Sequence, residues 1–354
     1  MKTINWLLIF LPVAAFAELF HWGDILIFAT SALAIIPLAG LLGVATEALA
    51  EKTGPRVGGL LNASLGNAAE LIITIIAIRA GRLELVKASI IGSILGNVLL
   101  VMGLSLVVGG LKNGIQKFNR SHAGLDATMM ILAVIALSVP SFFNTAIEPN
   151  KLRVEEFSLA AAAAILLIYV LSIIYGLKGK GAEEHPSGPS VEPSHTGPKW
   201  STRQALLILI ASVAGIALMS EFLVGSVESV TSVLGFSEFF VGIIIIPLIG
   251  NIAEHLVAVQ VAYKNQMDLS LAIAVGSSLQ IALFVAPALV FLSLVLGNPL
   301  TLEFNNFELV AMMAASFIAA LVSLDGESNW LEGAMLLIVY VILALAFFFL
   351  PAGI

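Results

Sequence analysis

The feature that most constrains the fold of this chain is a series of apolar stretches, each long enough to cross a lipid bilayer. Of the 354 residues, 59% are hydrophobic and 11% are charged, whereas soluble domains carry about 25% charged residues. Such long uninterrupted runs do not fit the alternating pattern of a membrane β-barrel. The sequence therefore predicts an all-α integral membrane protein with about 11 transmembrane helices. Hydropathy places them at 4–20, 25–49, 57–79, 88–111, 124–144, 157–177, 204–224, 239–262, 270–296, 307–323 and 331–351.

A polar segment at 179–203 divides the predicted helices into two groups. It carries four prolines among serines and glycines, a composition that cannot bury a core and that predicts a flexible linker. We expect an extra N-terminal transmembrane helix within 1–24, one five-helix repeat in 25–178 and a second in 204–354. The apolar run that ends at Ala17 also resembles a signal peptide. A first spanning helix is favoured over it because one lysine is a weak positive region, and cleavage of residues 1–17 stays open.

The distribution of lysine and arginine predicts how the chain is oriented in the membrane. Basic residues gather in the cytoplasmic loops of membrane proteins. The N-terminus and the 179–203 linker are therefore predicted to be cytoplasmic, and the C-terminus outside. Eleven basic residues lie on the side of the N-terminus and five on the other: Lys2, Lys52, Arg56, Lys112, Lys117, Arg120, Lys178, Lys180, Lys199, Arg203 and Lys264, against Arg79, Arg82, Lys87, Lys151 and Arg153.

A short polar motif occurs twice within the apolar runs. Gly66-Asn67-Ala68-Ala69-Glu70 returns 184 positions later as Gly250-Asn251-Ile252-Ala253-Glu254, and the register continues from Gly92-Ser93 to Gly276-Ser277. Five predicted spans separate the starts of the two motif helices, so these helices should run in opposite directions. Two halves related in this way form an inverted-topology repeat, which in secondary transporters places the substrate site near the midplane of the bilayer.

The two duplicated carboxylates, Glu70 and Glu254, are the strongest candidates for a functional site. An ionisable side chain at that depth in a membrane is costly and marks function by default. The chain has no cysteine, and an oxygen-rich ligand set suits Ca²⁺ before Mg²⁺. An isolated Asn or Ser in a spanning helix also commonly serves only as a contact between helices. With the two glutamates, the candidate metal ligands are Asn67, Asn251, Gly66, Gly250, Ser93, Ser277, Asn97 and Gln280.

These motifs carry a family resemblance. GNAAELI followed by GSILGN, and GNIAEH followed by GSSLQIALFVAP, resemble the two signature repeats of the calcium/cation–proton exchangers, within the calcium–cation antiporter superfamily. Sodium/calcium exchangers resemble G-T-S-x-P-E at the place where this chain has Asn67 and Asn251. The resemblance covers nearly the whole chain and implies an eleven-helix layout with an extra first helix. Eukaryotic members carry a strongly acidic stretch between the halves, whereas this linker has only Glu183, Glu184 and Glu192.

The predicted function is the exchange of Ca²⁺, or a similar divalent cation, for protons by alternating access. Two facing carboxylates become neutral either with one divalent cation or with two protons. If only the neutral forms let the helices rearrange, the two ions are exchanged and neither leaks. His255, Glu47 and Glu221 are further candidates for a proton pathway, together with Glu70 and Glu254 themselves. We expect no cofactor, Ca²⁺ and H⁺ as transported ions, and no nucleic-acid partner, because the net charge is −7.

Other functions remain open on the sequence alone. An exchanger driven by Na⁺, one that moves Mn²⁺, and a passive cation channel would use similar oxygen ligands. An enzyme is not expected, because the chain has no cysteine and neither an H-E-x-x-H nor a G-x-S-x-G motif. The short termini and linker suggest a bacterial plasma membrane. A homo-oligomer is compatible with the sequence but is not specified by it.

Overall fold

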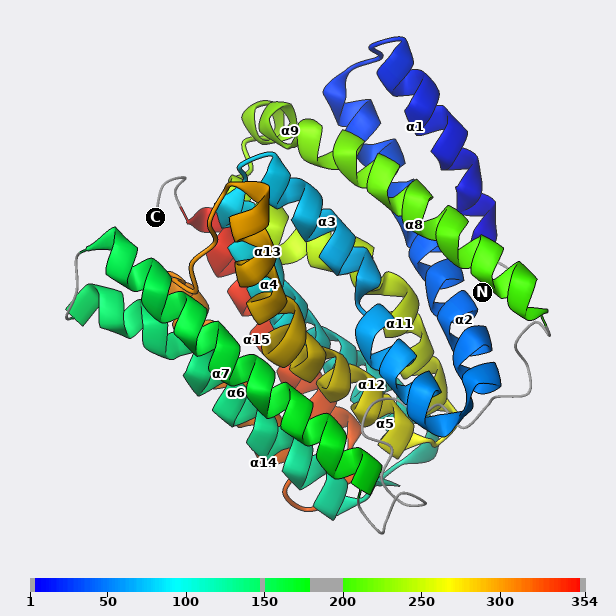
Figure 1. Ribbon diagram of the computed structural model, residues 1–354. Helices are drawn as coiled ribbons and strands as arrows, with labels where there is room; N and C mark the ends of the chain where they lie inside the picture. The colour runs from blue at the N-terminus through cyan, green and yellow to red at the C-terminus, as the bar shows by residue number, and fades with distance from the viewer. Residues whose placement is uncertain (1–3, 147–149, 179–199, 351–354) are drawn as a thin grey trace.

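The computed structural model describes residues 4–146, 150–178 and 200–350, and nearly all of them are helical (Figure 1). Most of the predicted linker, at 179–199, lies outside the described residues. In chain order the elements are η1 Asn5–Ile9, α1 Phe10–Leu19, α2 Asp24–Leu65, α3 Ala68–Arg79, α4 Leu83–Leu95, η2 Gly96–Val101, α5 Met102–Asn113, β1 Gln116–Lys117, α6 Arg120–Ala146, α7 Lys151–Lys178, α8 Thr202–Gly225, α9 Val227–Leu234, α10 Glu238–Phe240, η3 Val241–Ile245, α11 Ile246–Tyr263, α12 Met267–Gln280, η4 Ile281–Val285, α13 Ala286–Leu296, α14 Asn306–Val322, β2 Glu327–Ser328 and α15 Trp330–Phe349.

All eleven apolar runs are helical, so the predicted all-α fold is confirmed. Eight helical segments of the described chain are long and apolar enough to span a bilayer. Two shorter apolar helices, Asn5–Leu19 and Asn306–Val322, coincide with the first and tenth predicted runs. The remaining run, 57–79, is divided between the end of α2 and α3. The eight long segments are Asp24–Thr53, Leu83–Asn113, Arg120–Asn144, Leu152–Tyr175, Thr202–Gly225, Glu238–Tyr263, Met267–Leu296 and Trp330–Phe349.

The apolar run predicted at 57–79 is not one continuous helix. A Cβ atom added to Gly58 would lie 2.5 Å from the carbonyl oxygen of Ala50, although residues eight apart in a straight helix are about 12 Å apart. The helical run of α2 therefore bends back on itself before it ends at Leu65. A second interruption at Gly66 and Asn67 separates α2 from α3. Asn67 takes the position before α3, but its side chain makes no capping bond to that helix.

Three of the spans widen locally into π-helical turns. These turns, η2, η3 and η4, interrupt otherwise continuous helices, and π-turns occur frequently at functional sites. Adding 184 to the numbers of α4, η2 and α5 gives the positions of α12, η4 and α13 to within one residue. The two halves thus share the irregularity as well as the helices, as expected for a repeat.

The helices form three groups, which Figure 1 shows side by side. α1, α2 and α8 lie on one flank, α6, α7 and α14 lie on the other, and the remaining long helices fill the centre. Contacts between helices occur in equivalent pairs. α2 packs on α8, and α6 packs on α14, its counterpart in the other half; α7 packs on α13 as α15 packs on α5. The last helix of each half therefore packs against a central helix of the other half, and the two pairs are equivalent under the repeat.

The two halves are inverted with respect to each other. Arg82 directly follows α3 and forms ion pairs with Glu228, on α9, and with Glu238. Glu238 begins the helical segment that ends at Tyr263 and carries the second motif. The end of α3 therefore lies beside the start of that segment, and the two motif helices run antiparallel. This confirms the predicted inverted repeat.

Equivalent polar contacts hold the loops at the two ends of the molecule. At one end, Asn298 Nδ2 donates to the carbonyl oxygen of Ile78 at 2.9 Å. At the other, Gln116 Nε2 donates to the carbonyl oxygen of Ala262 at 3.0 Å, and Ala262 is the repeat equivalent of Ile78. The Gln116 loop also forms the two-residue β1–β2 pairing with the segment before α15. These contacts fix the ends of the motif helices in both halves.

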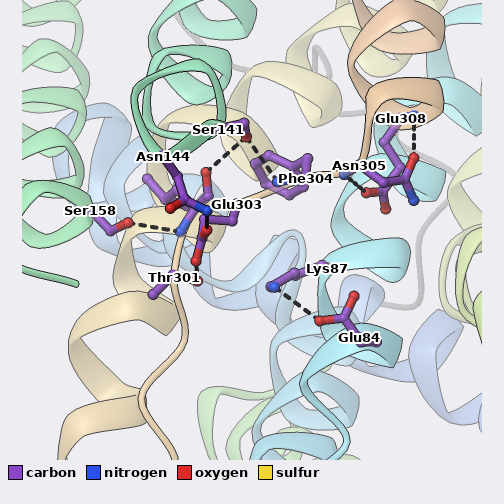
Figure 2. A network of polar contacts seen from close by, with 11 residues as sticks. Glu84, Lys87, Ser141, Asn144, Ser158, Thr301, Glu303, Phe304, Asn305 and Glu308 are labelled. Atoms are coloured by element: carbon purple, nitrogen blue, oxygen red, sulfur yellow. Dashed lines mark hydrogen bonds and ion pairs between the residues drawn. The ribbon is translucent and has the colours of Figure 1, made fainter. Parts of the chain in front are cut away.

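Figure 2 shows how the loop before α14 is anchored at the first of these ends. The Ser141 hydroxyl, on α6, donates to the Leu302 carbonyl oxygen and accepts from the Phe304 backbone N–H at 2.8 Å. The Ser158 hydroxyl, on α7, accepts from the Leu302 N–H at 3.1 Å. Asn305 then caps α14. The flank helices thereby hold the loop that follows the central helix α13.

The central helices approach each other closely where glycines leave room. A Cβ atom on Gly92 of α4 would lie 2.0 Å from the carbonyl oxygen of Ile243 in η3. One on Gly242 would lie 2.8 Å from Ala88 Cβ. Helices within membranes associate through such small residues, because lipid offers no hydrophobic drive for helix–helix contact. This contact brings the helix of Ser93 directly against the helix of Asn251.

Candidate functional site

The two duplicated glutamates lie in one polar cluster between the halves. Glu70, in the first turn of α3, is 4% exposed, and its side chain lies against Gly250, where a Cβ atom would come within 3.4 Å of Glu70 Cγ. Glu254, on α11, is partly buried, and its Oε2 accepts from the Ser277 hydroxyl at 3.1 Å. When both carboxylates are ionised, their charges repel each other. Glu70 Oε1 has no hydrogen-bond partner among the described residues.

Asn67 joins the broken helix of the first half to α12 of the second. Its Nδ2 donates to Gln280 Oε1 at 2.7 Å, and its Oδ1 accepts from the Ser277 hydroxyl at 2.8 Å. These bonds explain why Asn67 does not cap α3: its oxygen, which would accept from the helix N–H groups, is used across the interface. A Cβ atom on Gly66 would lie 3.2 Å from Gln280 Oε1. The break before α3 is therefore held by side chains from the other half.

The equivalent contacts on the other side of the cluster are looser. Asn251 Nδ2 donates to the Ser93 hydroxyl at 3.4 Å. His255 Nε2 and Asn97 Oδ1 are 3.0 Å apart. Asn97 Nδ2 is buried and has no partner among the described residues. Both asparagines and Ser93 are almost fully buried, so water does not satisfy them from the surface.

The carboxylates, asparagines and serines of the cluster occur in equivalent pairs, one from each half. The residues that surround these pairs differ between the halves. The Asn67–Ser277 pair and the Asn251–Ser93 pair are equivalent under the repeat, at 2.8 and 3.4 Å. Gln280 takes the position that Gly96 has in the first half. On one side Gln280, Asn67 and Ser277 are linked by short contacts, and the single Ser277 proton is within reach of both Asn67 and Glu254. On the other side the contacts of Asn251 and His255 are not linked to each other.

Beside Asn251 lies a crevice too narrow for a water molecule, and one of its walls comes from the last helix. Tyr340, on α15, lines it and is half-buried. No sequence pattern indicates this residue beyond a lone hydroxyl in an apolar helix. The other lining residues are Ser93, Gly96, Leu100, Pro247, Leu248, Asn251 and His255.

The structure brings together most of the predicted site residues but not all of them. The ten predicted ligands and His255 lie on α3, α4, α11 and α12, the break before α3 and the start of η2. Glu47 is half-buried on α2, and Glu221 is exposed on α8. Neither is hydrogen-bonded to the cluster among the described residues. No group of three or more His, Cys, Asp or Glu side chains in the described part of the chain is arranged to hold a metal ion. The acidic groups of the cluster are thus two, surrounded by neutral oxygens.

A family model described as sodium/calcium exchanger protein matches the chain twice, over residues 23–178 and 204–349. The chain belongs to the sodium/calcium exchanger family. The two matches coincide with the two inverted halves, and each contains one glutamate of the cluster.

Several similar proteins extend over nearly the same length as this chain. It is 44% identical to a Ca²⁺/H⁺ antiporter of Aphanothece halophytica, an alignment that covers 98% of this chain and 96% of the relative. It is 42% identical to the Ca²⁺/H⁺ antiporter ChaA of Bacillus subtilis, with 96% of each chain covered. The solved structure of native YfkE superposes with a TM-score of 0.86 at 39% identity and covers 98% of this chain and 100% of that one. A structure of the H⁺/Ca²⁺ exchanger CAX, 16% identical with a TM-score of 0.74, shows the same fold.

Proposed function

We propose that this family member exchanges Ca²⁺ for protons by alternating access, and that Glu70 and Glu254 bind either the cation or protons. The observation that carries the proposal is the pairing of one carboxylate from each inverted half within a single buried cluster of amide and hydroxyl oxygens. Glu70 Oε1 is buried and has no hydrogen-bond partner among the described residues, so this oxygen can coordinate a cation without first breaking a bond. Relatives at 42–44% identity that are described as Ca²⁺/H⁺ antiporters support the same exchange.

The oxygen atoms of the cluster suit Ca²⁺ as the transported cation. Ca²⁺ takes six to eight oxygen ligands in a flexible geometry. The two carboxylates, Asn67, Asn251, Ser93 and Ser277 supply such oxygens from four segments. Several of them now bond to each other, and cation binding replaces those bonds, such as the one from Ser277 to Glu254. When the cation leaves, its oxygen ligands can bond to one another again. This lowers the cost of releasing the cation, which a carrier must do in every cycle.

The same geometry couples the cation to protons. Two carboxylates that repel each other in a site screened from water are costly to keep ionised together. One Ca²⁺ or two protons remove that cost. If the halves rearrange only when the site is neutral, Ca²⁺ cannot cross one way without protons crossing the other way.

The distribution of basic residues supports an orientation for this exchange. The excess of lysine and arginine beside the N-terminus and around 179–203 favours the cytoplasm for both, and the outside for the C-terminus. In a bacterial plasma membrane the inward proton gradient would then drive Ca²⁺ out of the cell.

Ca²⁺ uptake into proteoliposomes under an imposed pH gradient, without Na⁺, tests the proposal. Glu70→Gln and Glu254→Gln should each lower the uptake rate by about 100-fold, because the loss of one partner from a buried charged site costs about 3 kcal/mol or more. Glu18→Gln, which removes an exposed carboxylate of α1 outside the cluster, should leave the rate unchanged.

Three results would contradict the proposal. Normal exchange by either cluster variant would exclude that glutamate as the ion-binding group. A strict requirement for a Na⁺ gradient would favour a Na⁺-driven exchanger. Uptake that follows the Ca²⁺ gradient regardless of pH would favour a channel. Repeating the assay with Mn²⁺ measures the cation preference of the same site.

A further inference from the structure

A groove separate from the ion-binding cluster lies at one end of the helix bundle. It has a volume of about 630 Å³ and runs between the start of α2 and the short helix α9. Figure 1 shows α9 and the connection from α1 to α2 at the same end of the molecule. No residue of the ion-binding cluster lines it. One wall comes from Trp22 and the first two turns of α2, and the other from one face of α9.

The walls of the groove change from polar to apolar along the helix axis. Asp24 begins α2, and Ile25, Leu26 and Ala29 follow within the next two turns. The side chains of Ile25 and Leu26 are 43% and 42% exposed although they belong to a membrane-spanning segment. The groove therefore has a polar rim at the end of the span and an apolar wall directed into the bilayer.

Helix α9 supplies the opposite wall with the same division. Ser229, Ser232 and Val233 are three and four residues apart and so share one helix face, while Val227 and Val230 are buried on the other face. Val233 is 65% exposed. Short amphipathic helices of this kind lie in the interface of a membrane.

The rim presents hydrogen-bond acceptors and no cation. Asp24 has neither a hydrogen bond nor an ion pair among the described residues. The Ser232 hydroxyl donates its one proton to the carbonyl oxygen of Ser229 at 2.9 Å, which leaves its lone pairs for a ligand. The nearby carboxylate of Glu228 is already paired with Arg82. A complementary ligand must carry a positive charge and N–H donors.

We propose that this groove binds a phosphatidylethanolamine molecule of the surrounding bilayer. Its ammonium group, with three N–H donors, bonds to Asp24 and Ser232, and one acyl chain lies against Leu26, Ala29 and Val233. Trp22, exposed at the end of the span, has the position at which indole rings mark the membrane interface. Phosphatidylcholine has the charge but no N–H donor, and phosphatidylglycerol brings a negative charge toward Asp24.

Native mass spectrometry of the full chain, equilibrated with equal amounts of phosphatidylethanolamine, phosphatidylcholine and phosphatidylglycerol, tests this proposal. The protein should retain phosphatidylethanolamine in preference to both others. Asp24→Asn should lower that preference about fivefold, the upper range for an exposed ion pair. Ala29→Phe should fill the apolar wall and reduce retention of all three lipids. Glu18→Gln, an exposed carboxylate of α1 outside the groove, is the matched control and should change nothing.

Several outcomes would overturn the proposal. Equal retention of the three lipids, or a preference for phosphatidylglycerol, would exclude recognition of the ammonium group. An unchanged lipid preference in Asp24→Asn would exclude this groove as the binding site. A dimer that dissociates in Ala29→Phe would show that a second copy of the chain, and not a lipid, occupies the groove. The assay measures binding and is therefore independent of the proposed ion exchange.

Discussion

The central residue of the asymmetric cluster is Ser277. A serine hydroxyl has one proton to donate, yet Ser277 lies within hydrogen-bond distance of both Asn67 Oδ1, at 2.8 Å, and Glu254 Oε2, at 3.1 Å. Its proton bonds to one of these two oxygens at a time, one from each half of the chain. Its repeat equivalent, Ser93, makes one longer contact, at 3.4 Å to Asn251. The two serines are chemically identical and differ only in their surroundings.

We expect Ser277→Ala to impair the site more than Ser93→Ala does. Ser277→Ala removes a candidate oxygen ligand and the donor that orients Asn67 Oδ1, and the loss of such a buried partner costs about 1–3 kcal/mol. Ser277→Ala should accordingly raise the Ca²⁺ concentration for half-maximal transport about tenfold, and Ser93→Ala less than about threefold, because its bond is already long. Transport measured over a range of Ca²⁺ concentrations gives both values. Equal effects, or a larger effect at Ser93, would contradict the asymmetry.

At the scale of single residues, the sequence predicts which side chains form the site but not how they pair. The duplication identifies Glu70 and Glu254, and helical spacing adds their neighbours. The bonds from Asn67 to Gln280 and from His255 to Asn97 join residues more than 150 positions apart, and no local pattern encodes them. Tyr340 was missed for the same reason, since its place beside the crevice depends on how α15 packs on α5.

At the scale of elements, the contact between α4 and η3 depends on the absence of a side chain at Gly92. A Cβ atom there would lie 2.0 Å from the Ile243 carbonyl oxygen, so the two backbones would have to separate.

Gly92→Ala should therefore destabilise the protein by about 2 kcal/mol or more. Gly43→Ala is the matched control, because a Cβ atom at Gly43 meets nothing within 4 Å, and an open helical Gly→Ala change is neutral or stabilising. Thermal unfolding in detergent measures both. A melting temperature for Gly92→Ala equal to that of the parent chain would show that α4 and η3 can move apart without cost.

The positions of the helices are largely encoded in hydropathy, whereas their irregularities are not. The predicted runs fall on helices, with ends that differ by up to several residues, as at α7, which begins at Lys151 where the prediction begins at 157. The break at Gly66 and Asn67 and the π-turns depend on bonds to other helices. A hydropathy window averages over them, so it joined 57–79 into one helix.

At the scale of the whole molecule, the inverted repeat predicts that the two loop clusters lie on opposite sides of the membrane. The chain has no cysteine, so single introduced cysteines report the side directly. Lys117→Cys lies in the cluster predicted to be cytoplasmic, and Glu84→Cys in the outer one. Both side chains are exposed. The second change also removes the ion pair with Lys87, whose side chain is mostly buried, so the folding of this variant is checked before labelling.

A membrane-impermeant maleimide should label Glu84→Cys in intact cells and Lys117→Cys only after lysis. The parent chain serves as the blank. The reverse pattern would place the N-terminus outside and invert the direction of transport, while the fold and the cluster would stay as described. Labelling of both variants in intact cells would contradict the inverted arrangement itself.

The central claim, that one site exchanges Ca²⁺ for protons, is tested most directly by measuring the two fluxes together. Proteoliposomes without Na⁺, loaded with a pH indicator and given a Ca²⁺ gradient at equal starting pH, should move protons against the direction of Ca²⁺ flow. The pH change should be abolished by Glu70→Gln and kept by Glu18→Gln. Ca²⁺ movement without a pH change in the parent protein, once leak of the membrane is prevented, would contradict the account.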